Sequence, residues 1–410
     1  MKHQLWASNF EPDSTCRWLY FGLAGLGVSC FSRVTPNAFE ALFFWWVTFS
    51  SLAVLICGYR RIVSLPPQVW LIFLSWAALY VLMCISLLWS PVDAGMQVLF
   101  EYRVLLAFVL AGMAITVSTS NFEDLLKIYW YAGSLGILAL YLERVGFFDG
   151  HLYVFRPRNS YLIGGVISSM YTALSLTLWF YGSKKRFKWV YFAGALLASF
   201  DTLFFEPGRT AYFQTLAVWF CFLFASMGRQ HSFLAIILGL TILGLIFLTS
   251  TKFTIGLTLI FEQFQAWISG TEQINSTGLR LQWISWALSR GWEDPILGIG
   301  VGNYVSTIQL AHEAGSFPKL TNNLHSEIAN IFLMTGCVGL ALFASQYVIL
   351  AALSFYEKNQ ALAFLAITSV GIFVLHGIAN STFKDFGEKN LLIAVLPLVV
   401  ALLIKSSHGS

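Results

Sequence analysis

Charged residues are scarce in this chain of 410 residues: only 11% are Asp, Glu, Lys or Arg, whereas 57% are hydrophobic. A soluble domain carries about 25% charged residues, so this chain cannot cover a globular surface with groups that water solvates. The composition therefore excludes an ordinary soluble protein. It predicts an all-α, polytopic transmembrane bundle, because helices satisfy their own backbone hydrogen bonds in lipid. The net charge of +4 is too small and too dispersed to indicate a nucleic-acid partner.

Paired cysteines and metal-ligand motifs are also missing. The six cysteines lie singly within or beside apolar stretches, which favours small buried or lipid-facing side chains over disulfides or metal ligands. The nearest carboxylate pair in the outer segments, Glu293-Asp294, has no His or Cys beside it. We therefore expect no metal and no cofactor. No basic start followed by a cleavage motif is present, so we expect the first span to be an uncleaved anchor.

Long apolar stretches are what the chain has in abundance, and about 12 of them could cross a bilayer. They lie near 18–33, 38–58, 69–89, 97–118, 124–146, 160–182, 187–206, 210–228, 232–251, 326–355, 361–380 and 390–405. The first and last are short, so ten or eleven spans are the alternative. This division predicts nine spans in residues 1–251, a long loop over 252–325, and three spans in 326–410.

Lys and Arg in the short connections orient the bundle. With a cytoplasmic N-terminus most of them fall inside, including the basic cluster at residues 184–188. An even number of spans then places both termini in the cytoplasm and the long loop outside.

Five arginines and two lysines fall in the short outer connections, where this rule disfavours them, and three of the arginines lie in segments that could bind an anion. Arg156 and Arg158 flank Pro157, which favours an extended chain and allows both guanidinium groups to share one face. Arg209 follows a Pro-Gly turn and opens a helix, whose N-terminus attracts anions. These arginines either extend to the membrane interface as snorkelling side chains or bind an anionic ligand.

The long loop has helical periodicity rather than the composition of a disordered segment. Its first part predicts an amphipathic helix at the membrane surface, with apolar residues Leu257, Ile260, Phe261, Phe264 and Trp267. A second helix is expected over 276–290 and carries Arg280, Trp283 and Trp286. Tryptophans at this spacing indicate packing more often than sugar stacking. Glycines 298, 300 and 302 resemble a dinucleotide fingerprint only loosely, and no βαβ unit surrounds them, so we reject that interpretation.

His325 stands where the loop re-enters the membrane. We expect Asn322 or Asn323 to cap the next helix, which would put His325 in its first turn. The positive end of that helix would lower the pKa of the imidazole and keep it neutral, as a general base requires. The alternative is a structural histidine. Within the fourth span, Glu101 and Arg103 predict an internal ion pair, with a substrate role for either as the alternative.

Taken together, these segments resemble the O-antigen ligase family of bacterial membrane proteins. The resemblance rests on the order and spacing of five elements around the long loop. They are Pro207-Gly208-Arg209-Thr210-Ala211, Gly278-Leu279-Arg280 followed by Trp283 and Ala287, Asp294 to Gly302, Asn323-Leu324-His325, and Gly336 with Gly339.

The resemblance implies a membrane-embedded glycosyltransferase. Such a ligase moves a glycan from undecaprenyl diphosphate to a sugar hydroxyl of lipid A–core oligosaccharide, at the periplasmic face of the bacterial inner membrane. It implies that Arg209 and Arg280 bind the donor diphosphate, with Arg156 and Arg158 as helpers, and that His325 deprotonates the acceptor. Transfer would be metal-independent and would invert the anomeric centre. The polyprenyl chain would lie among membrane lipids in apolar grooves between spans.

Two further residues, Asn323 and Trp283, are implied to contact substrate. The alternatives are an O-antigen or capsule polymerase of the same superfamily, a protein O-oligosaccharyltransferase, or a transporter of lipid-linked glycans. A transporter would place polar residues and broken helices near the bilayer midplane.

Overall fold

The computed structural model describes residues 14–32, 37–63, 65, 67–118, 122–144, 161–181, 185–205, 208–227, 229–271 and 275–409, and these residues form helices and connections without any strand. The N-terminal half contains α1 (Ser14–Ser32), α2 (Asn37–Cys57), α3 (Tyr59–Val63), α4 (Pro67–Ile85), η2 (Ser86–Leu88), α5 (Val92–Glu101), α6 (Val104–Val117), α7 (Asp124–Arg144), α8 (Tyr161–Tyr181) and α9 (Lys185–Phe204). The rest contains α10 (Arg209–Met227), η4 (Arg229–His231), α11 (Ser232–Thr249), α12 (Thr251–Ser269), α13 (Ser276–Gly291), η5 (Val301–Asn303), α14 (Tyr304–Glu313), α15 (Glu327–Tyr356), α16 (Gln360–Ala379) and α17 (Phe386–Gly409). The all-α membrane bundle expected from composition is thus confirmed.

Eleven of the twelve expected spans each coincide with one long helix, and the fourth, 97–118, falls on the two helices α5 and α6. Fewer helices pass a strict test of length and hydropathy. Among the described residues eight are long and apolar enough to cross a membrane, or nine if α5 and α6, bent by 43° against each other, form one broken span. Helices α1, α8 and α9 fall outside this set; three of the first four residues of α9 are basic, and α9 also contains Asp201. The chain is a multi-pass membrane protein.

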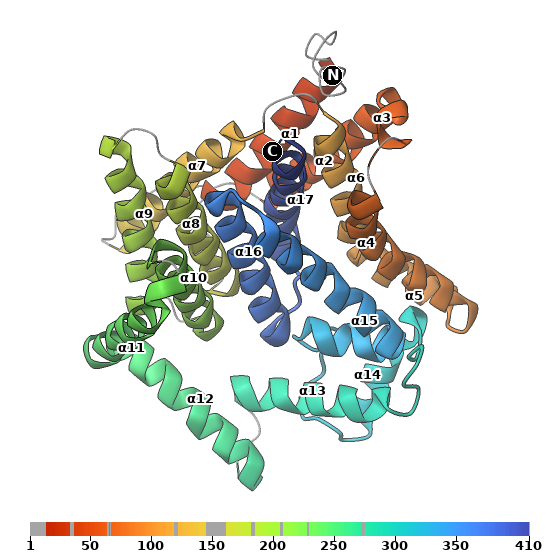
Figure 1. Cartoon of the computed structure of the whole chain (residues 1–410). Helices are drawn as coiled ribbons and strands as arrows, with labels where there is room; N and C mark the ends of the chain where they lie inside the picture. The colour runs from red at the N-terminus through yellow and green to blue at the C-terminus, as the bar shows by residue number, and fades with distance from the viewer. Residues whose placement is uncertain are drawn as a thin grey trace.

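Helix α17 forms the centre of the bundle. All of the residues in the apolar stretch of α17 are buried (100%), whereas only 11% of those in the apolar stretch of α11 are. Figure 1 shows α17 surrounded by other helices and α11 at the edge. Large apolar side chains such as Phe233, Leu240 and Leu248 of α11 are exposed, as lipid-facing residues must be.

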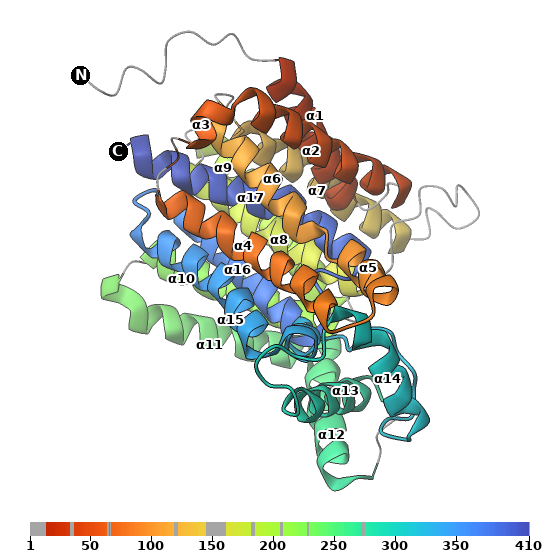
Figure 2. The same ribbon diagram turned by 90° about the vertical axis from the view of Figure 1, so that its right-hand side faces the viewer.

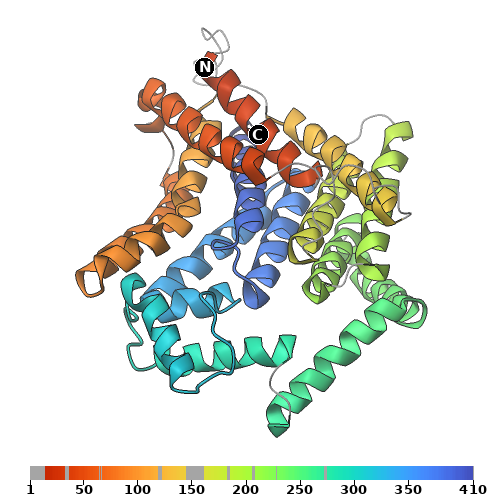
Figure 3. The ribbon, with the colours of Figure 1, turned by 180° about the vertical axis from the view of Figure 1, so that it is seen from behind.

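The two ends of the bundle differ in structure. Helices α12, α13 and α14 gather at one end, called here the loop face, as Figures 1 and 3 show. The C-terminal end of α17 lies at the other end, called the opposite face (Figure 2). There Lys405 Nζ donates to the Ser118 carbonyl at 2.9 Å, and Ser406 Oγ donates to Glu357 at 2.9 Å.

The helices predicted within the long loop are present. The helix expected over 276–290 spans Ser276–Gly291, where the Asn275 side chain accepts from Gly278 N as the N-cap. The amphipathic helix is α12, which follows α11 after one non-helical residue, Ser250, and ends at Gly270 with a φ of 69°. A third helix, α14, was not predicted.

Helix α15 is broken at Gly336, and the 295–300 segment of the loop fills the break. Gly336 has φ 63° and ψ −159°. The carbonyls of Leu333 and Met334 accept from the N–H groups of Ile299 and Gly300, both at 3.0 Å. Cys337 N and Val338 N donate instead to Pro295 O at 2.8 Å and Ile296 O at 3.2 Å. The loop thus replaces two intrahelical hydrogen bonds, which makes the break tolerable inside a span.

We predict that Gly298→Ala destabilises the protein more than Gly270→Ala. Both glycines have a positive φ, 68° and 69°, so each substitution carries a similar conformational cost of about 1–3 kcal/mol. A Cβ at Gly298 would also lie 2.6 Å from backbone atoms of α15, whereas nothing lies within 4 Å of one at Gly270. The apparent melting temperatures of the purified variants measure the difference. Equal melting temperatures would contradict this prediction, because they would show that the 295–300 segment can shift to accommodate the Cβ without loss of stability.

Candidate functional site

His325 has the most unusual backbone of the non-glycine residues that the structure describes, with a φ of 50°. It does not lie in the first turn of a helix, so that prediction was wrong. Helix α15 begins at Glu327, and its N-cap is Ser326, whose hydroxyl accepts from Ala329 N. His325 therefore occupies a left-handed position just before the cap. A strained residue of this kind persists only where its surroundings hold it, and such residues cluster at functional sites.

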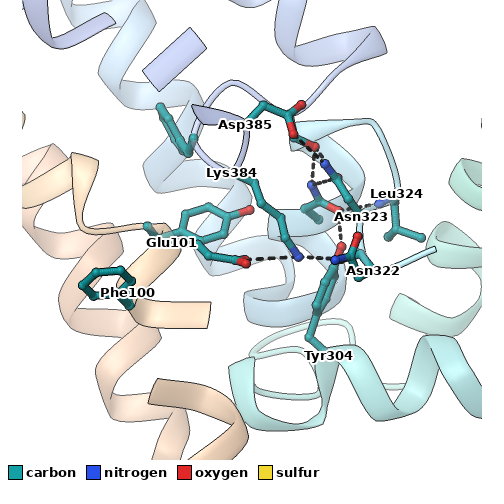
Figure 4. Close-up of polar contacts among 12 residues, drawn as sticks. Phe100, Glu101, Tyr304, Asn322, Asn323, Leu324, Lys384 and Asp385 are labelled. Atoms are coloured by element: carbon teal, nitrogen blue, oxygen red, sulfur yellow. Dashed lines mark hydrogen bonds and ion pairs between the residues drawn. The ribbon is translucent and has the colours of Figure 1, made fainter. Parts of the chain in front are cut away.

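The Asn323 carboxamide holds that backbone in place. Its Oδ1 accepts from His325 N at 3.0 Å, and also from the Asn330 amide and the Ser381 hydroxyl. Its Nδ2 donates to Asp385 Oδ1 at 3.2 Å (Figure 4). Asn323 does not cap α15, because its side chain joins the loop of residues 321–326, which contains His325 and is called here the base loop, to the connection between α16 and α17.

Further buried hydrogen bonds, around Asn330 and Glu327, support the contact between Asn323 and His325. Tyr304 of α14 donates to Asn330 Oδ1, and Asn330 Nδ2 donates to Ser381 Oγ at 2.8 Å. Glu327, fully buried, accepts from the Tyr102 hydroxyl at 2.6 Å and from Phe383 N at 2.9 Å. Groups from the bend between α5 and α6, from α14 and α15, and from the 380–385 connection therefore converge at the start of α15, next to His325. Networks in which every member is paired fix a geometry strongly.

Glu101 pairs with Lys384 and not with Arg103, so the predicted partner was wrong. Lys384 Nζ lies 3.2 Å from Glu101 Oε2, donates to the Asn322 carbonyl, and stands 4.7 Å from the Tyr304 ring centroid. Figure 4 shows Lys384 bridging the end of α5 and the base loop. Arg103 points the other way, towards aromatic rings of α2 and α5. The bend between α5 and α6 sends the two charges in different directions.

The imidazole of His325 is kept neutral by its surroundings. Burial lowers the pKa of His325 to about 4, and the positive charges of Arg280, Lys319 and Lys384 act in the same direction. Its Nδ1 is buried and has no hydrogen-bond partner among the described residues. The neutral form was predicted, but burial and not a helix terminus is the main cause. Nearby, burial and the charge of Glu388 raise the pKa of Asp385 to about 6.

Helix α13 connects His325 to the arginines. Thr277, Arg280 and Trp283 recur every three residues and so lie along one side of the helix. The Trp283 ring packs against the His325 ring at a centroid distance of 5.4 Å. At the other end, Arg209 donates to Thr277 Oγ1 at 3.1 Å and to Gln263 Oε1 at 2.8 Å. The structure thus brings Arg209, Arg280, Trp283 and His325 to one side of α13.

Two predicted helpers, Arg156 and Arg158, lie outside the described residues. In the part of the chain that is described, no group of three or more His, Cys, Asp or Glu side chains could hold a metal ion. All six cysteines are free.

Several residues of this centre gave little signal in the sequence. Lys384 and Asp385 stood out only as charges in a short outer connection, and Glu327 only as a residue two positions after His325. Tyr304, Asn330 and Ser381 belong to types that fill any loop or helix end. Only the fold shows that these residues meet.

We predict that Lys384→Met moves the acid limb of the activity profile to higher pH. If His325 is the general base that the sequence predicts, activity falls as pH drops through its pKa, because the imidazole becomes protonated. Removing a cation that lowers this pKa lets it rise, so protonation begins at higher pH. Initial rates measured across pH test this, with Lys384→Arg, which keeps the charge, as control. An unchanged acid limb in Lys384→Met would contradict the electrostatic influence of Lys384.

The architecture defines a polytopic helical membrane protein whose polar centre is assembled at one face, from an extramembrane helical loop and the ends of spans. Residues 194–344, from α9 through the first half of α15, match the O-antigen ligase family model, and the chain therefore carries an O-antigen ligase domain. The family resemblance seen in the sequence is thus confirmed, and the domain indicates the O-antigen ligase/polymerase superfamily. No curated protein matches the chain. Arg209, Arg280 and His325 lie inside the matched stretch, whereas Glu101, Lys384 and Asp385 lie outside it.

Proposed function

We propose that the protein transfers a glycan from undecaprenyl diphosphate to a sugar hydroxyl of lipid A–core oligosaccharide, at the periplasmic face of the bacterial inner membrane. The observation that carries this proposal is the placement of His325: its backbone is in the left-handed region and is held by Asn323, and its ring packs on Trp283. Burial and the nearby charge of Arg280 lower the pKa of this imidazole, which favours the neutral form that a base requires. A base beside cations suits a reaction in which a hydroxyl loses a proton while a diphosphate leaves. With the loop face periplasmic, both termini are cytoplasmic.

The proposed reaction is a direct displacement. His325 takes the proton of the acceptor hydroxyl while the oxygen attacks C1 of the donor sugar. The bond between C1 and the diphosphate oxygen breaks, and undecaprenyl diphosphate departs with the electron pair. Arg209 and Arg280, with Arg156 and Arg158 as helpers, neutralise the charge that develops on the leaving group. Attack opposite the leaving group inverts the anomeric centre.

Asn323 and Trp283 have supporting roles in this proposal. The hydrogen bonds of the Asn323 carboxamide to His325, Asn330, Ser381 and Asp385 favour a positioning role. Trp283 is buried and packs on the imidazole ring. Direct contact of either residue with substrate stays a prediction.

Reconstitution in proteoliposomes distinguishes the proposal from its nearest rival. The purified protein would be supplied with an undecaprenyl-diphosphate glycan and with lipopolysaccharide that ends at the core. Glycan attached to lipid A–core is the expected product. Elongated lipid-linked glycan would instead identify a polymerase of the same superfamily. Movement of intact donor across the bilayer without any transfer would identify a transporter.

Transfer is expected to continue in excess EDTA, because guanidinium groups supply the positive charge with which a metal ion would otherwise neutralise the diphosphate. The measurement is the rate of product formation after dialysis against EDTA, compared with a sample to which Mg²⁺ is restored. Loss of activity that Mg²⁺ rescues would contradict a metal-independent mechanism.

A further inference from the structure

Arg103 is a cation on the flank of the bundle, at the bend between α5 and α6. Its guanidinium lies 3.9 Å from the Phe100 ring centroid, 5.2 Å from Phe44 and 5.4 Å from Trp45. One terminal nitrogen donates to the Phe100 carbonyl, and Nε is buried without a hydrogen-bond partner. Among the described residues no carboxylate lies within ion-pair distance of Arg103, because Glu101 turns towards Lys384.

The surroundings of Arg103 open towards lipid. Phe44 closes the inner side, since it is only 2% exposed, whereas Phe100 is 57% and Trp45 37% exposed. The rings of Trp45 and Phe100 lie 6.4 Å apart and connect α2 to α5 on either side of the guanidinium. A ligand that reaches Arg103 along this surface would come from the bilayer.

A cation within a broken span is unfavourable unless neighbouring groups stabilise its charge. A charge at membrane depth costs about 2.5–3.5 kcal/mol on insertion scales, and charged residues there are usually paired. Stacked aromatic rings offset part of this cost. The planar fork of arginine still presents donors that match phosphate oxygens, and exposed aromatic side chains suit the interface where lipid phosphates lie.

We propose that Arg103, flanked by Phe44, Trp45 and Phe100, is a binding site for a lipid phosphate presented from the bilayer. Two lipids offer this chemistry, an anionic phospholipid and a polyprenyl diphosphate. The site adjoins the candidate active centre, since Glu101 and Tyr102, which precede Arg103, contact Lys384 and Glu327. A phosphate bound there would steady the bend that holds the base loop. The inference does not depend on the proposed function, because lipid binding needs no turnover.

Native mass spectrometry of the full-length protein tests the site. The protein would be released from phosphatidylcholine nanodiscs that contain phosphatidylglycerol in one arm and undecaprenyl diphosphate in the other. Arg103→Gln is expected to retain about tenfold less of at least one anionic lipid than wild type, the loss expected for a charge-assisted hydrogen bond. Loss in the first arm identifies a phospholipid site, and loss confined to the second identifies a site for donor lipid. Equal retention of both lipids by Arg103→Gln and wild type would overturn the proposal.

Two variants keep this result interpretable. Arg290→Gln also removes an arginine near the loop face, but Arg290 is paired with Glu293 at 2.8 Å and with Asp294 at 3.2 Å, so lipid retention should not change. Trp45→Leu keeps Arg103 and removes a flanking ring, and should weaken retention about two- to fivefold. If Arg103→Gln does not fold, the outcome depends on Trp45→Leu, and unchanged retention in that variant would overturn the proposal.

Discussion

Replacing His325 by alanine is expected to abolish measurable transfer while leaving the protein folded and able to bind its lipid-linked donor. General-base catalysis contributes about 10²–10⁴-fold to a rate, so the residual turnover should fall to the assay background. Donor binding should survive because Arg209 is held by Gln263 and Thr277, contacts that do not involve His325. The measurements are the rate of glycan transfer to lipid A–core and the affinity for the donor.

His312→Ala is the matched control for this experiment. His312 lies on α14 at the same face, is half-buried, and interacts through Nδ1 with the Phe317 carbonyl at 2.9 Å. Losing that contact should leave transfer close to the wild-type rate. Wild-type turnover by His325→Ala would remove the general-base role. A loss of both transfer and donor binding would instead point to a structural role for His325.

Features with a local physical signature could be predicted from the sequence. Helix α13 begins where expected because Ser276 follows the capping residue Asn275 and an apolar stripe continues to Gly291. The span positions followed from apolar length alone. His325 stood out as a histidine at the edge of a span, near arginines that the positive-inside rule disfavours. Each of these signals is contained within a few neighbouring residues.

The contacts that hold His325 could not be predicted because they join residues far apart in the chain. Glu101 had a nearby cation in Arg103, and nothing local showed that the bend between α5 and α6 would turn it towards Lys384. Asn323 had the composition of a helix cap, but the 380–385 connection offers its side chain partners that only the fold provides. The glycines at 298 and 300 marked a special backbone without indicating that it would fill a break in α15.

Arg280→Gln is expected to lower kcat/KM by about 10²–10³-fold, the usual cost of losing one group that stabilises charge in a transition state. Arg280 has a second effect, because among the charges around His325 it is the foremost one that lowers the pKa of that imidazole. Removing it should therefore raise the pKa of His325 and move the acid limb of kcat/KM, which reports the free enzyme, to higher pH. Arg280→Lys keeps the charge but not the planar fork, so it should lower the rate and leave the limb almost unmoved.

Arg209→Gln separates the two effects. Arg209 contacts α13 at Thr277, six residues before Trp283, which packs on His325. Its variant should therefore lose diphosphate binding with a smaller shift of the acid limb. Arg290→Gln, in which the lost arginine was paired with Glu293 and Asp294, should change neither quantity. The comparison needs only kcat/KM measured across pH for the four variants. An equal shift of the acid limb in Arg280→Gln and Arg209→Gln would show that the two arginines affect the pKa of His325 alike, which would contradict separate roles for the two ends of α13. If neither lowered kcat/KM, the diphosphate would have to bind elsewhere on the loop face.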